Sequence, residues 1–441
     1  MFACGAANFG QFGMGPDMVA DYSKFKRSEW VEGQIKKGAF GAESAGLESI
    51  AAGGLHTLFT DEKGTVWSCG VNDDAALGRV TNNVPDPNNE GSFLSIDELT
   101  SWPWPVQSLV DENFRTVRIA AGDSIGAAVS DKGEFRVWGT FRGNEGALGF
   151  SNEQDKQDLP APILTLSHKP GDYEKVTSIA AGNNHLIICT THGNLYTLGA
   201  GEKGQLGRKI LERRKIHGTH PEKISLGTRS RKAVEVGAGS YHSFAIDENG
   251  DVWGWGLNTM GQTGTGWLSA DDDIVLLPQK VDSLSQDSLG GDRVTQIAAG
   301  EHHSLFLTRA GKVYACGRLD GGQLGLKDDH PAITEWKAEY AELFNGESPQ
   351  FLPTPTLVPY PDGDPVVQIS CGIHNNAAVT SGGKLYCWGQ GLQGELGCGD
   401  DDDVVTAPRV VVKGDKWLAS AVSCGGQHTL ALLKDNRDQS A

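Results

Sequence analysis

Apolar and polar residues alternate in short runs along much of this chain, as in Thr65-Val66-Trp67-Ser68-Cys69. A period of two residues is typical of β-strands, whereas a helix repeats its apolar positions about every three to four residues. Pairs such as Asn249-Gly250 separate consecutive runs. Such pairs favour tight hairpin turns, because their backbone tolerates positive φ. The pattern therefore predicts an all-β chain of short antiparallel strands.

One spacing of glycines recurs seven times in the sequence. Each unit begins with a Gly-x-x-His-type turn. In the first six units a second glycine follows 11 positions later and a third 6 positions after that, before a Gly-Gln-Leu-Gly-like end; the seventh unit has Asn436 at the second position and is cut short. The first glycines of the units are Gly53, Gly122, Gly182, Gly239, Gly300, Gly372 and Gly425. A repeat of this length indicates a ring or stack of similar units, each of them here a four-stranded antiparallel meander.

The two ends of the chain complement each other. The seventh unit stops at Ala441 before its second half, and residues 2–13 supply that half. A ring closed in this way exposes no raw sheet edge. We therefore predict a seven-bladed β-propeller of four-stranded antiparallel blades, a single domain over residues 1–441 whose last blade is closed by the N-terminal strands. The repeat cores are expected near residues 50–79, 119–150, 179–208, 236–266, 297–326, 369–399 and 422–436, the last closed by residues 2–15.

Composition narrows the class of protein. The net charge of −18 and the 59 glycines describe a turn-rich, soluble chain, without an apolar run near the ~20 residues that a membrane helix needs. The N-terminus lacks the basic and apolar regions of a secretory signal, so we expect an intracellular protein. No Cys-x-x-Cys pair occurs among the eight cysteines. We expect them to be buried free thiols, with no metal and no cofactor.

Three segments carry a resemblance to a known family: Gly-Asn-Asn-His-Leu at 182–186, Leu-Tyr-Thr-Leu-Gly-Ala-Gly-Glu-Lys-Gly-Gln-Leu-Gly-Arg at 195–208 and Cys-Gly-Gly-Gln-His-Thr-Leu at 424–430. Over nearly its whole length the chain resembles the regulator of chromosome condensation family, the guanine nucleotide exchange factors of the small GTPase Ran. The resemblance implies exchange without covalent chemistry, binding to Ran and to nucleosomes, and a place on chromatin in the nucleus. We expect a monomer.

The second unit has an irregular interval. Its third and closing glycines, Gly139 and Gly149, are 10 residues apart, whereas the interval is 8 in the other six units. Two extra residues would let this loop project from the propeller face, although insertions at loop tips are often harmless. In the family the loop is a wedge pressed against the GTPase. The resemblance assigns to the wedge the residues Thr140, Phe141, Arg142, Gly143, Asn144, Glu145 and Gly146.

Alternate turns of a meander lie on opposite faces of the propeller. We call the face with the Gly-x-x-His turns and the wedge the wedge face, and the face with the hairpins between second and third strands the hairpin face. The turns expected on the wedge face are mostly acidic, which favours basic partners. The resemblance implies that the GTPase contacts Asp123, Asn184, His303, His428 and Asn8. The recurring histidines also fit a structural role, with a hydrogen bond that braces each turn.

Two of these positions depart from the family pattern. Asn184 and Asn8 stand where an acidic residue is expected from animal members. The difference suggests a member from outside the animals. It removes a charge at each position but keeps a hydrogen-bonding group.

Residues 208–232 form a basic segment, with nine lysines and arginines opposed only by Glu212 and Glu222. We expect this segment on the hairpin face, where it can bind phosphates or an acidic protein surface. A solvated charged loop is the alternative. In the family a loop at this place contacts nucleosomes, so the candidate chromatin-binding residues are Arg213, Arg214, Arg229 and Arg231.

Two other function classes stay open. A chromatin-bound interaction scaffold without exchange activity would keep the basic segment but would not need the wedge. A propeller hydrolase would need a histidine paired with a carboxylate or a set of metal ligands. The sequence offers one recurring histidine and scattered acids, and nucleotide exchange requires neither arrangement because it breaks no covalent bond.

Overall fold

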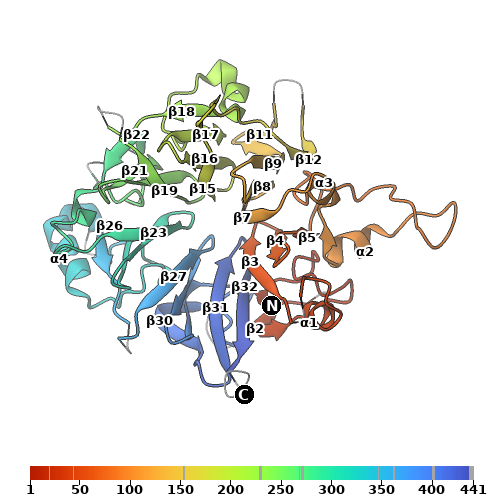
Figure 1. Cartoon of the computed structure of the whole chain (residues 1–441). Helices are drawn as coiled ribbons and strands as arrows, with labels where there is room; N and C mark the ends of the chain where they lie inside the picture. The colour runs from red at the N-terminus through yellow and green to blue at the C-terminus, as the bar shows by residue number, and fades with distance from the viewer. Residues whose placement is uncertain are drawn as a thin grey trace.

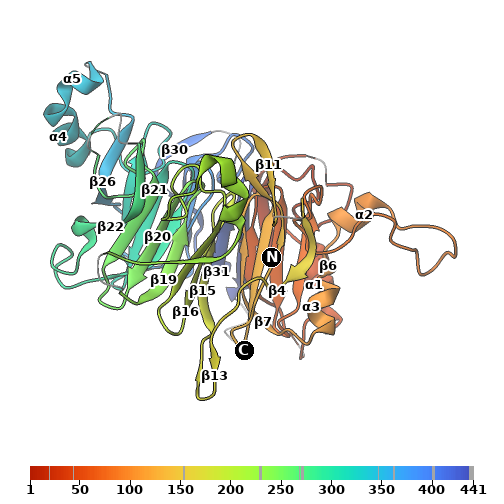
Figure 2. The same cartoon turned by 90° about the horizontal axis from the view of Figure 1, so that it is seen from above.

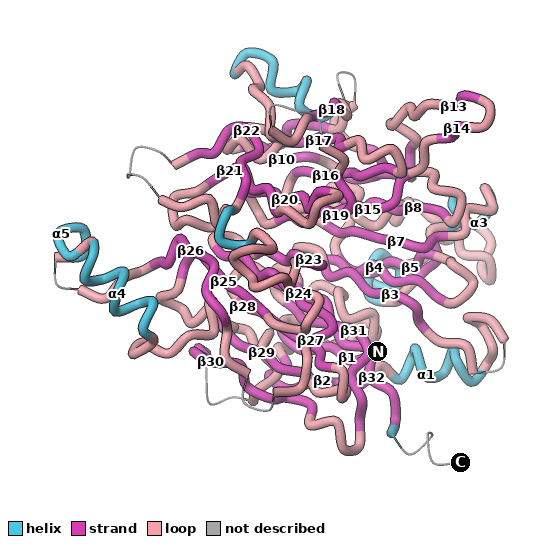
Figure 3. Tube along the Cα trace, turned by 60° about the vertical axis from the view of Figure 1, so that its left-hand side comes forward, coloured by secondary structure: helices cyan, strands magenta, loops and turns pink. Residues whose placement is uncertain are grey.

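The computed structural model describes residues 1–436 apart from 19, 43, 152–153, 228–230, 268, 270–272, 346, 361–362 and 400–402. Over these residues, seven four-stranded antiparallel sheets are arranged around a central axis as the blades of a propeller (Figure 1). Figure 3 shows that strands form the body, whereas the helices lie at its periphery. The predicted seven-bladed fold is confirmed.

From the innermost strand outward, blade 1 contains β3 (Leu47–Ala52), β4 (His56–Asp61), β5 (Val66–Gly70) and β6 (Trp104–Pro105). Blade 2 contains β7 (Thr116–Ala121), β8 (Ile125–Ser130), β9 (Phe135–Gly139) and β12 (Gln157–Ala161); blade 3 contains β15 (Val176–Ala181), β16 (His185–Thr190), β17 (Leu195–Gly199) and β18 (Glu222–Ile224). Blade 4 contains β19 (Ala233–Ala238), β20 (His242–Asp247), β21 (Val252–Leu257) and β22 (Ile274–Lys280). Blade 5 contains β23 (Val294–Ala299), β24 (His303–Thr308), β25 (Val313–Arg318) and β26 (Phe351–Leu357); blade 6 contains β27 (Val366–Cys371), β28 (Asn375–Thr380), β29 (Leu385–Gln390) and β30 (Val404–Val412).

Blade 7 joins the two ends of the chain. From inside outward it contains β31 (Trp417–Cys424), β32 (His428–Asp435), β1 (Phe2–Gly5) and β2 (Tyr22–Arg27). Strand β1 pairs with β32 in antiparallel register, with Phe2 opposite Ala431 and Gly5 opposite His428. In Figure 1 the red strand β2 accordingly belongs to the same blade as the blue β31 and β32, at its opposite edge from β31. The predicted closure by the N-terminal strands is confirmed.

The remaining elements lie in the connections. They are the helices α1 (Glu29–Lys36), α2 (Ile96–Ser101), α3 (Gln107–Asp111), α4 (Pro331–Glu339) and α5 (Ala341–Phe344), the 3₁₀ segments η1 (Glu212–Thr219) and η2 (Asp282–Leu284), and the hairpins β10 (Phe141–Gly143) with β11 (Gly146–Gly149) and β13 (His168–Lys169) with β14 (Asp172–Tyr173). No helix among the described residues is long and apolar enough to cross a membrane. All eight cysteines are free thiols, and six of them are buried; Cys371 and Cys398 are half-buried.

The first glycine of each unit is required by the close approach of neighbouring blades. A Cβ atom at Gly239 would lie 2.6 Å from the carbonyl oxygen of Gly300, and one at Gly182 would lie 2.3 Å from the carbonyl oxygen of Gly239. The same contact recurs at all seven glycines, at 2.3 to 2.7 Å. Any larger residue would therefore push two blades apart at the centre of the ring.

Four of the recurring histidines each fasten one blade to the next. His185 Nε2 lies 2.8 Å from Ser243 Oγ, and that hydroxyl donates to the carbonyl oxygen of Gln205 at 2.7 Å. Because its only proton is used there, Ser243 accepts a hydrogen bond from Nε2–H of a neutral imidazole. The expectation that each histidine braces its own turn is wrong, since the ring reaches the second strand of the following blade.

The same tie recurs around the propeller. It joins His242 to Ser304 at 2.7 Å, His303 to Asn376 at 2.8 Å and His428 to Thr57 at 2.8 Å, and Asn375 takes the place of the histidine in its contact with Thr429 at 3.2 Å. The pair His428–Thr57 fastens the last blade to the first. These side chains are buried, so the ties are shielded from water.

Two blade junctions lack this tie. Gly126 stands where a partner side chain is needed, and both ring nitrogens of His56 are buried without a hydrogen-bond partner among the described residues. Between blades 2 and 3, Ile125 and Leu186 replace both partners and share an apolar cluster with Phe141. The junction beside the wedge is therefore held by apolar packing.

The glycine ring predicts a large difference between two alanine substitutions. Gly239→Ala should lower the free energy of unfolding by about 2–3 kcal/mol, because its Cβ has no room. Gly33→Ala, in helix α1 with nothing within 4 Å of the new Cβ, should raise it by about 0.5–1 kcal/mol. Urea unfolding measures both; a Gly239→Ala protein as stable as the parent would contradict the close contact.

The buried histidines predict a pH dependence of stability. Burial lowers the pKa of His185 to about 3 and that of His303 to about 4. Because the unfolded value is near 6.5, the unfolded chain binds more protons at acidic pH. The contribution of these neutral histidines to the free energy of unfolding is thus complete above about pH 6.5. It is lost as the pH falls toward their pKa in the folded protein.

His185→Asn tests this dependence, because Asn375 already makes the corresponding tie with an amide. Between pH 6 and 4, the free energy of unfolding should fall less steeply with pH in the variant than in the parent. The difference in slope should be about 1.4 kcal/mol per pH unit, since one proton-binding group is gone. Urea unfolding at several pH values gives the slope. The control is His168→Asn, at an exposed position; equal slopes for His185→Asn and this control would argue against the buried neutral ring.

Candidate functional site

Residues 140–149 form a hairpin, which we call the wedge hairpin. Strands β10 and β11 pair with Gly143 opposite Gly146, so Asn144 and Glu145 lie at the tip. Figure 2 shows β11 on the upper side of the propeller and the β13–β14 hairpin on the lower side. The two extra residues of the second unit thus project from the wedge face, as predicted.

The base of the wedge hairpin is fixed in the propeller body. Phe141 is fully buried, and its ring stacks on Phe150 with centroids 6.1 Å apart. Thr140 is buried as well, and its Oγ1 donates to the carbonyl oxygens of Asp74 at 3.1 Å and Asp155 at 3.4 Å. These two residues of the predicted wedge therefore anchor it and do not reach a partner.

Neighbouring turns hold the exposed part of the hairpin. The backbone N–H of Arg142 donates to Asn184 Oδ1 at 2.8 Å, and the Arg142 guanidinium lies 2.6 Å from the Asp74 carboxylate. The backbone N–H of Asn144 donates to Glu202 Oε2 at 2.7 Å. Asn184, placed at the GTPase by resemblance, thus supports the hairpin directly, with a contact that needs an amide oxygen and no charge.

The segment η1 lies beside the wedge hairpin. The sequence did not predict this contact. Lys215 Nζ is 2.6 Å from Glu212, 3.1 Å from Glu202 and 3.4 Å from Glu145 at the hairpin tip. The carboxylates of Glu212, Glu202 and Glu145 hold the pKa of Lys215 above its ordinary value. In Figure 2 the lime-green η1 is drawn next to β11, on the wedge face.

The basic segment 208–232 is therefore divided between the two faces. In β18, Glu222 pairs with Thr197 toward the wedge face, and Ile224 pairs with Leu195 next to the hairpin turn. The chain crosses the blade along β18, so the prediction that the whole segment lies on the hairpin face is wrong for residues 208–220. The three-residue strand carries no alternating pattern that could have revealed the crossing.

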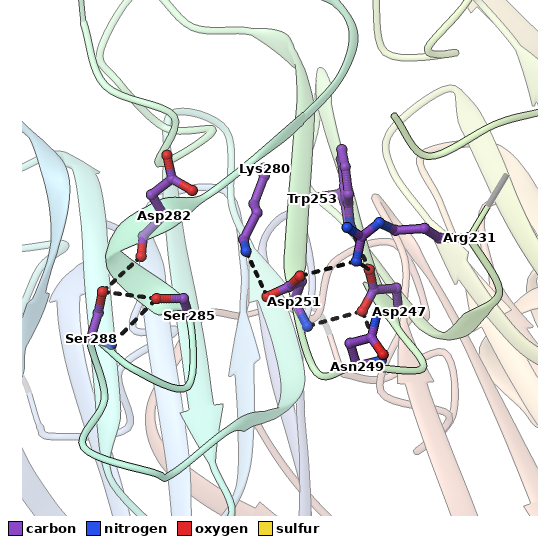
Figure 4. Close-up of polar contacts among 9 residues, drawn as sticks. All are labelled: Arg231, Asp247, Asn249, Asp251, Trp253, Lys280, Asp282, Ser285 and Ser288. Atoms are coloured by element: carbon purple, nitrogen blue, oxygen red, sulfur yellow. Dashed lines mark hydrogen bonds and ion pairs between the residues drawn. The ribbon is translucent and has the colours of Figure 1, made fainter. Parts of the chain in front are cut away.

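The four chromatin-binding candidates differ accordingly. Arg213 and Arg214 are exposed on η1, on the wedge face. Arg229 lies outside the described residues. Arg231 lies on the hairpin side, where Figure 4 shows it between two carboxylates: its Nη1 is 3.2 Å from Asp247 and 3.3 Å from Asp251.

Arg231 is held by further contacts of this network. Its guanidinium lies over the ring of Trp253, 5.6 Å from the centroid, and Asp251 also pairs with Lys280 at 2.9 Å. The Asp247 carboxylate is fully buried and accepts from Trp253 Nε1 at 3.0 Å. Arg231 thus neutralises a buried acid and keeps about a third of its side chain, 37%, exposed.

The remaining GTPase-facing candidates separate into surface and interior residues. Asn8 is exposed on the turn after β1, and Asp123 is half-buried at the mouth of the central channel, a space of about 300 Å³. Burial raises the pKa of Asp123, with Arg142 opposing and Asp74 adding to the shift. His303 and His428 are 1% and 0% exposed. Their rings tie blades together, so the expectation that they face a partner is corrected.

His302 and His374, which precede the buried repeat positions His303 and Asn375, are partly exposed. His302 Nδ1 and His374 Nε2 lie 3.4 and 3.7 Å from the Glu301 carboxylate on the wedge face. The nearby His302 is the main cause that lowers the pKa of Glu301. Strand alternation could have identified them, because each directly precedes a buried repeat position and therefore points the other way.

The described residues of the wedge face form a surface without a cluster of metal-ligating side chains. Over the described residues, no three His, Cys, Asp or Glu side chains come together as metal ligands. The features of this face include the wedge hairpin, the acidic turns around the channel, η1, and the helices α4 and α5, which stand above the body in Figure 2. Such a surface is suited to hold a partner whose charge varies across the contact area.

Comparison with known proteins gives a consistent result. Residues 1–431 match the RCC1-like domain. The chain is 37% identical to pim1 of the fission yeast Schizosaccharomyces pombe, over 88% of this chain and 67% of pim1. It is 33% identical to the guanine nucleotide exchange factor SRM1 of Saccharomyces cerevisiae, over 88% of this chain and 79% of SRM1.

The solved structures agree with this result. The crystal structure of Prp20p from Saccharomyces cerevisiae, described with its binding properties to Gsp1p and histones, superimposes with a TM-score of 0.82 at 28% identity, over 100% of this chain and 92% of that one. The glycine repeat, the closed ring of blades and the similar proteins all indicate one family. The chain belongs to the RCC1 family, that of the regulator of chromosome condensation.

Proposed function

We propose that this protein is the guanine nucleotide exchange factor of the GTPase Ran, which expels GDP with the wedge hairpin and allows GTP to load. The observation that carries the proposal is the hairpin itself, anchored by Phe141 and held by Asn184 and Glu202. Its family membership and the exchange factor SRM1 among its relatives support the proposal.

The mechanism is thermodynamic coupling without covalent chemistry. If the wedge face binds nucleotide-free Ran more tightly than loaded Ran, reciprocity requires that it weakens the nucleotide by the same factor. An acceleration of release of ~10⁵-fold requires a barrier lower by roughly 7 kcal/mol. Refilling then follows the cellular concentrations of nucleotides, which favour GTP.

The hairpin tip has the chemistry to compete with a phosphate. The Glu145 side chain is 85% exposed and carries a carboxylate on a backbone fixed from both sides. A GTPase holds its nucleotide through a phosphate-binding loop with a lysine, and through magnesium. A carboxylate pressed against that loop would pair with the lysine once the phosphates depart.

The same protein would act while docked on chromatin through its hairpin face. The support is Arg231 at the hairpin side of blade 4, followed by the exposed Lys232. Arg229 is close to them in sequence and lies outside the described residues. The relative Prp20p is described with binding to histones. Docking by this face leaves the wedge face free. Arg213 and Arg214 lie on the wedge face, so we assign chromatin binding to the hairpin face without them. A chromatin-bound scaffold without exchange activity is the competing function.

Shortening the wedge hairpin tests the exchange function. Deletion of Asn144 and Glu145 restores the eight-residue interval of the other units. Release of a fluorescent GDP from Ran should be fast with the parent and at least about 100-fold slower with this variant, because the contact with the phosphate-binding loop is lost.

A matched control keeps the result interpretable. Deletion of Asn88 and Asn89, exposed residues of the connection between β5 and β6, should leave the release rate within about twofold of the parent. No acceleration by the parent would leave the scaffold as the function. Equal rates for the parent and the shortened wedge would remove the wedge from the mechanism.

Nucleosome binding should depend on the hairpin face. The triple variant Arg229→Ala, Arg231→Ala, Lys232→Ala should bind nucleosomes at least about tenfold more weakly and with a shallower salt dependence, since each lost phosphate or acid contact reduces both. The double variant Arg213→Ala, Arg214→Ala should bind as the parent does. Titration of labelled nucleosomes at several salt concentrations measures this, and the reverse pattern would place chromatin on the wedge face.

A further inference from the structure

We infer that η1 braces the wedge hairpin and that Lys215 is a positioning residue for nucleotide exchange. The inference rests on the proposed function and names the group that keeps the hairpin ready for its partner. Lys215 comes from the connection between β17 and β18 of blade 3, whereas the hairpin belongs to blade 2. The brace therefore spans two blades.

The contacts form a continuous path from η1 to the hairpin tip. The Lys215 ammonium group pairs with Glu145 of the tip at 3.4 Å and with Glu202 at 3.1 Å. Glu202 uses its other carboxylate oxygen to accept from the backbone N–H of Asn144 at 2.7 Å. One cation thus holds the tip both through a side chain and through the backbone.

Like charges explain why the cation is needed. Glu145, Glu202 and Glu212 all approach the same ammonium group within 3.4 Å, and no second cation is paired with them among the described residues. Without Lys215 the three carboxylates would repel one another. Glu145 and Glu212 are both exposed, 85% and 79%, and can move away, whereas Glu202 is nearly buried. The departure of Glu145 would carry the hairpin tip along.

The brace is itself fixed to blade 3. The Arg208 guanidinium donates to the carbonyl oxygens of Gly218 at 3.2 Å and His220 at 3.1 Å, at the end of η1. Gly218 packs so closely on β17 that a Cβ there would lie 2.4 Å from the carbonyl oxygen of Gly199. Lys215 therefore extends from an anchored segment and not from a free loop.

The brace lies at a junction of the ring that has no histidine tie. Blades 2 and 3 meet through Ile125 and Leu186 and lack the histidine tie of most other junctions. The hairpin has glycines at 143, 146 and 149, whose backbone loses more freedom on ordering than that of other residues. A hairpin already ordered by Lys215 loses less entropy when it presses on a partner.

The test compares Lys215→Met with Lys209→Met. Both remove one positive charge from the same connection, but Lys209 is exposed, and the ion pairs to the hairpin among the described residues come from Lys215 and Asp74. Lys215→Met should speed amide hydrogen exchange in residues 142–146 by about tenfold and slow GDP release from Ran by about tenfold. Lys209→Met should change both within about twofold. Lys215→Arg keeps the charge and should restore most of both values.

The two readouts separate the brace from the proposed function. Faster hydrogen exchange in Lys215→Met, at an unchanged melting temperature, supports the brace even if the parent does not act on Ran. Unchanged hydrogen exchange in Lys215→Met overturns the brace, whatever the parent's activity. An unaltered rate of GDP release with a loosened hairpin overturns the positioning role.

Discussion

The close approach of seven glycines at the centre of the ring is the constraint on which the structure depends. At each blade junction a Cβ atom would lie within 2.7 Å of the next glycine's carbonyl oxygen, so only glycine permits the blades to meet. This contact sets the distance between the second strands of adjacent blades and brings His185 within reach of Ser243. The side-chain hydrogen bonds between blades recur because the distance between these second strands recurs. The ring also closes the chain through His428 and Thr57, so the N-terminal strands are positioned by the same geometry.

The wedge hairpin lies where this pattern is interrupted. Between blades 2 and 3 the polar tie is replaced by apolar side chains, and Phe141 at the base of the hairpin packs into their cluster. The hairpin is thus joined to the ring at an apolar junction. Its polar contacts come from the turns that carry Asp74, Asn184 and Glu202 and from Lys215 of η1. A rigid body therefore presents a small projecting element whose backbone is held from several sides. Such an arrangement suits a protein that must press on a partner without deforming itself.

Much of this arrangement could be predicted from the sequence. The glycine period determined the number of blades, the missing half of the seventh unit indicated the closure, and the interval from Gly139 to Gly149 located the hairpin. Contacts between units could not be predicted, because the partner of a repeat histidine belongs to another repeat and is serine, asparagine or threonine, and His56 has no such partner among the described residues. Resemblance placed His303 and His428 on the surface, whereas strand geometry puts them in the interior. The division of the basic segment was missed because it depends on the three-residue strand β18, too short to show a periodicity.

The central claim is that the wedge face prefers Ran without nucleotide. It is tested most directly by the affinity of this protein for nucleotide-free Ran and for GDP-bound Ran, measured by calorimetry or surface plasmon resonance. The account predicts binding at least about 1,000-fold tighter to the nucleotide-free form, and release of that complex when GDP or GTP is added, because coupling between the two ligands is reciprocal. Equal affinity for the two forms would contradict the account, since a surface without this preference cannot displace a nucleotide.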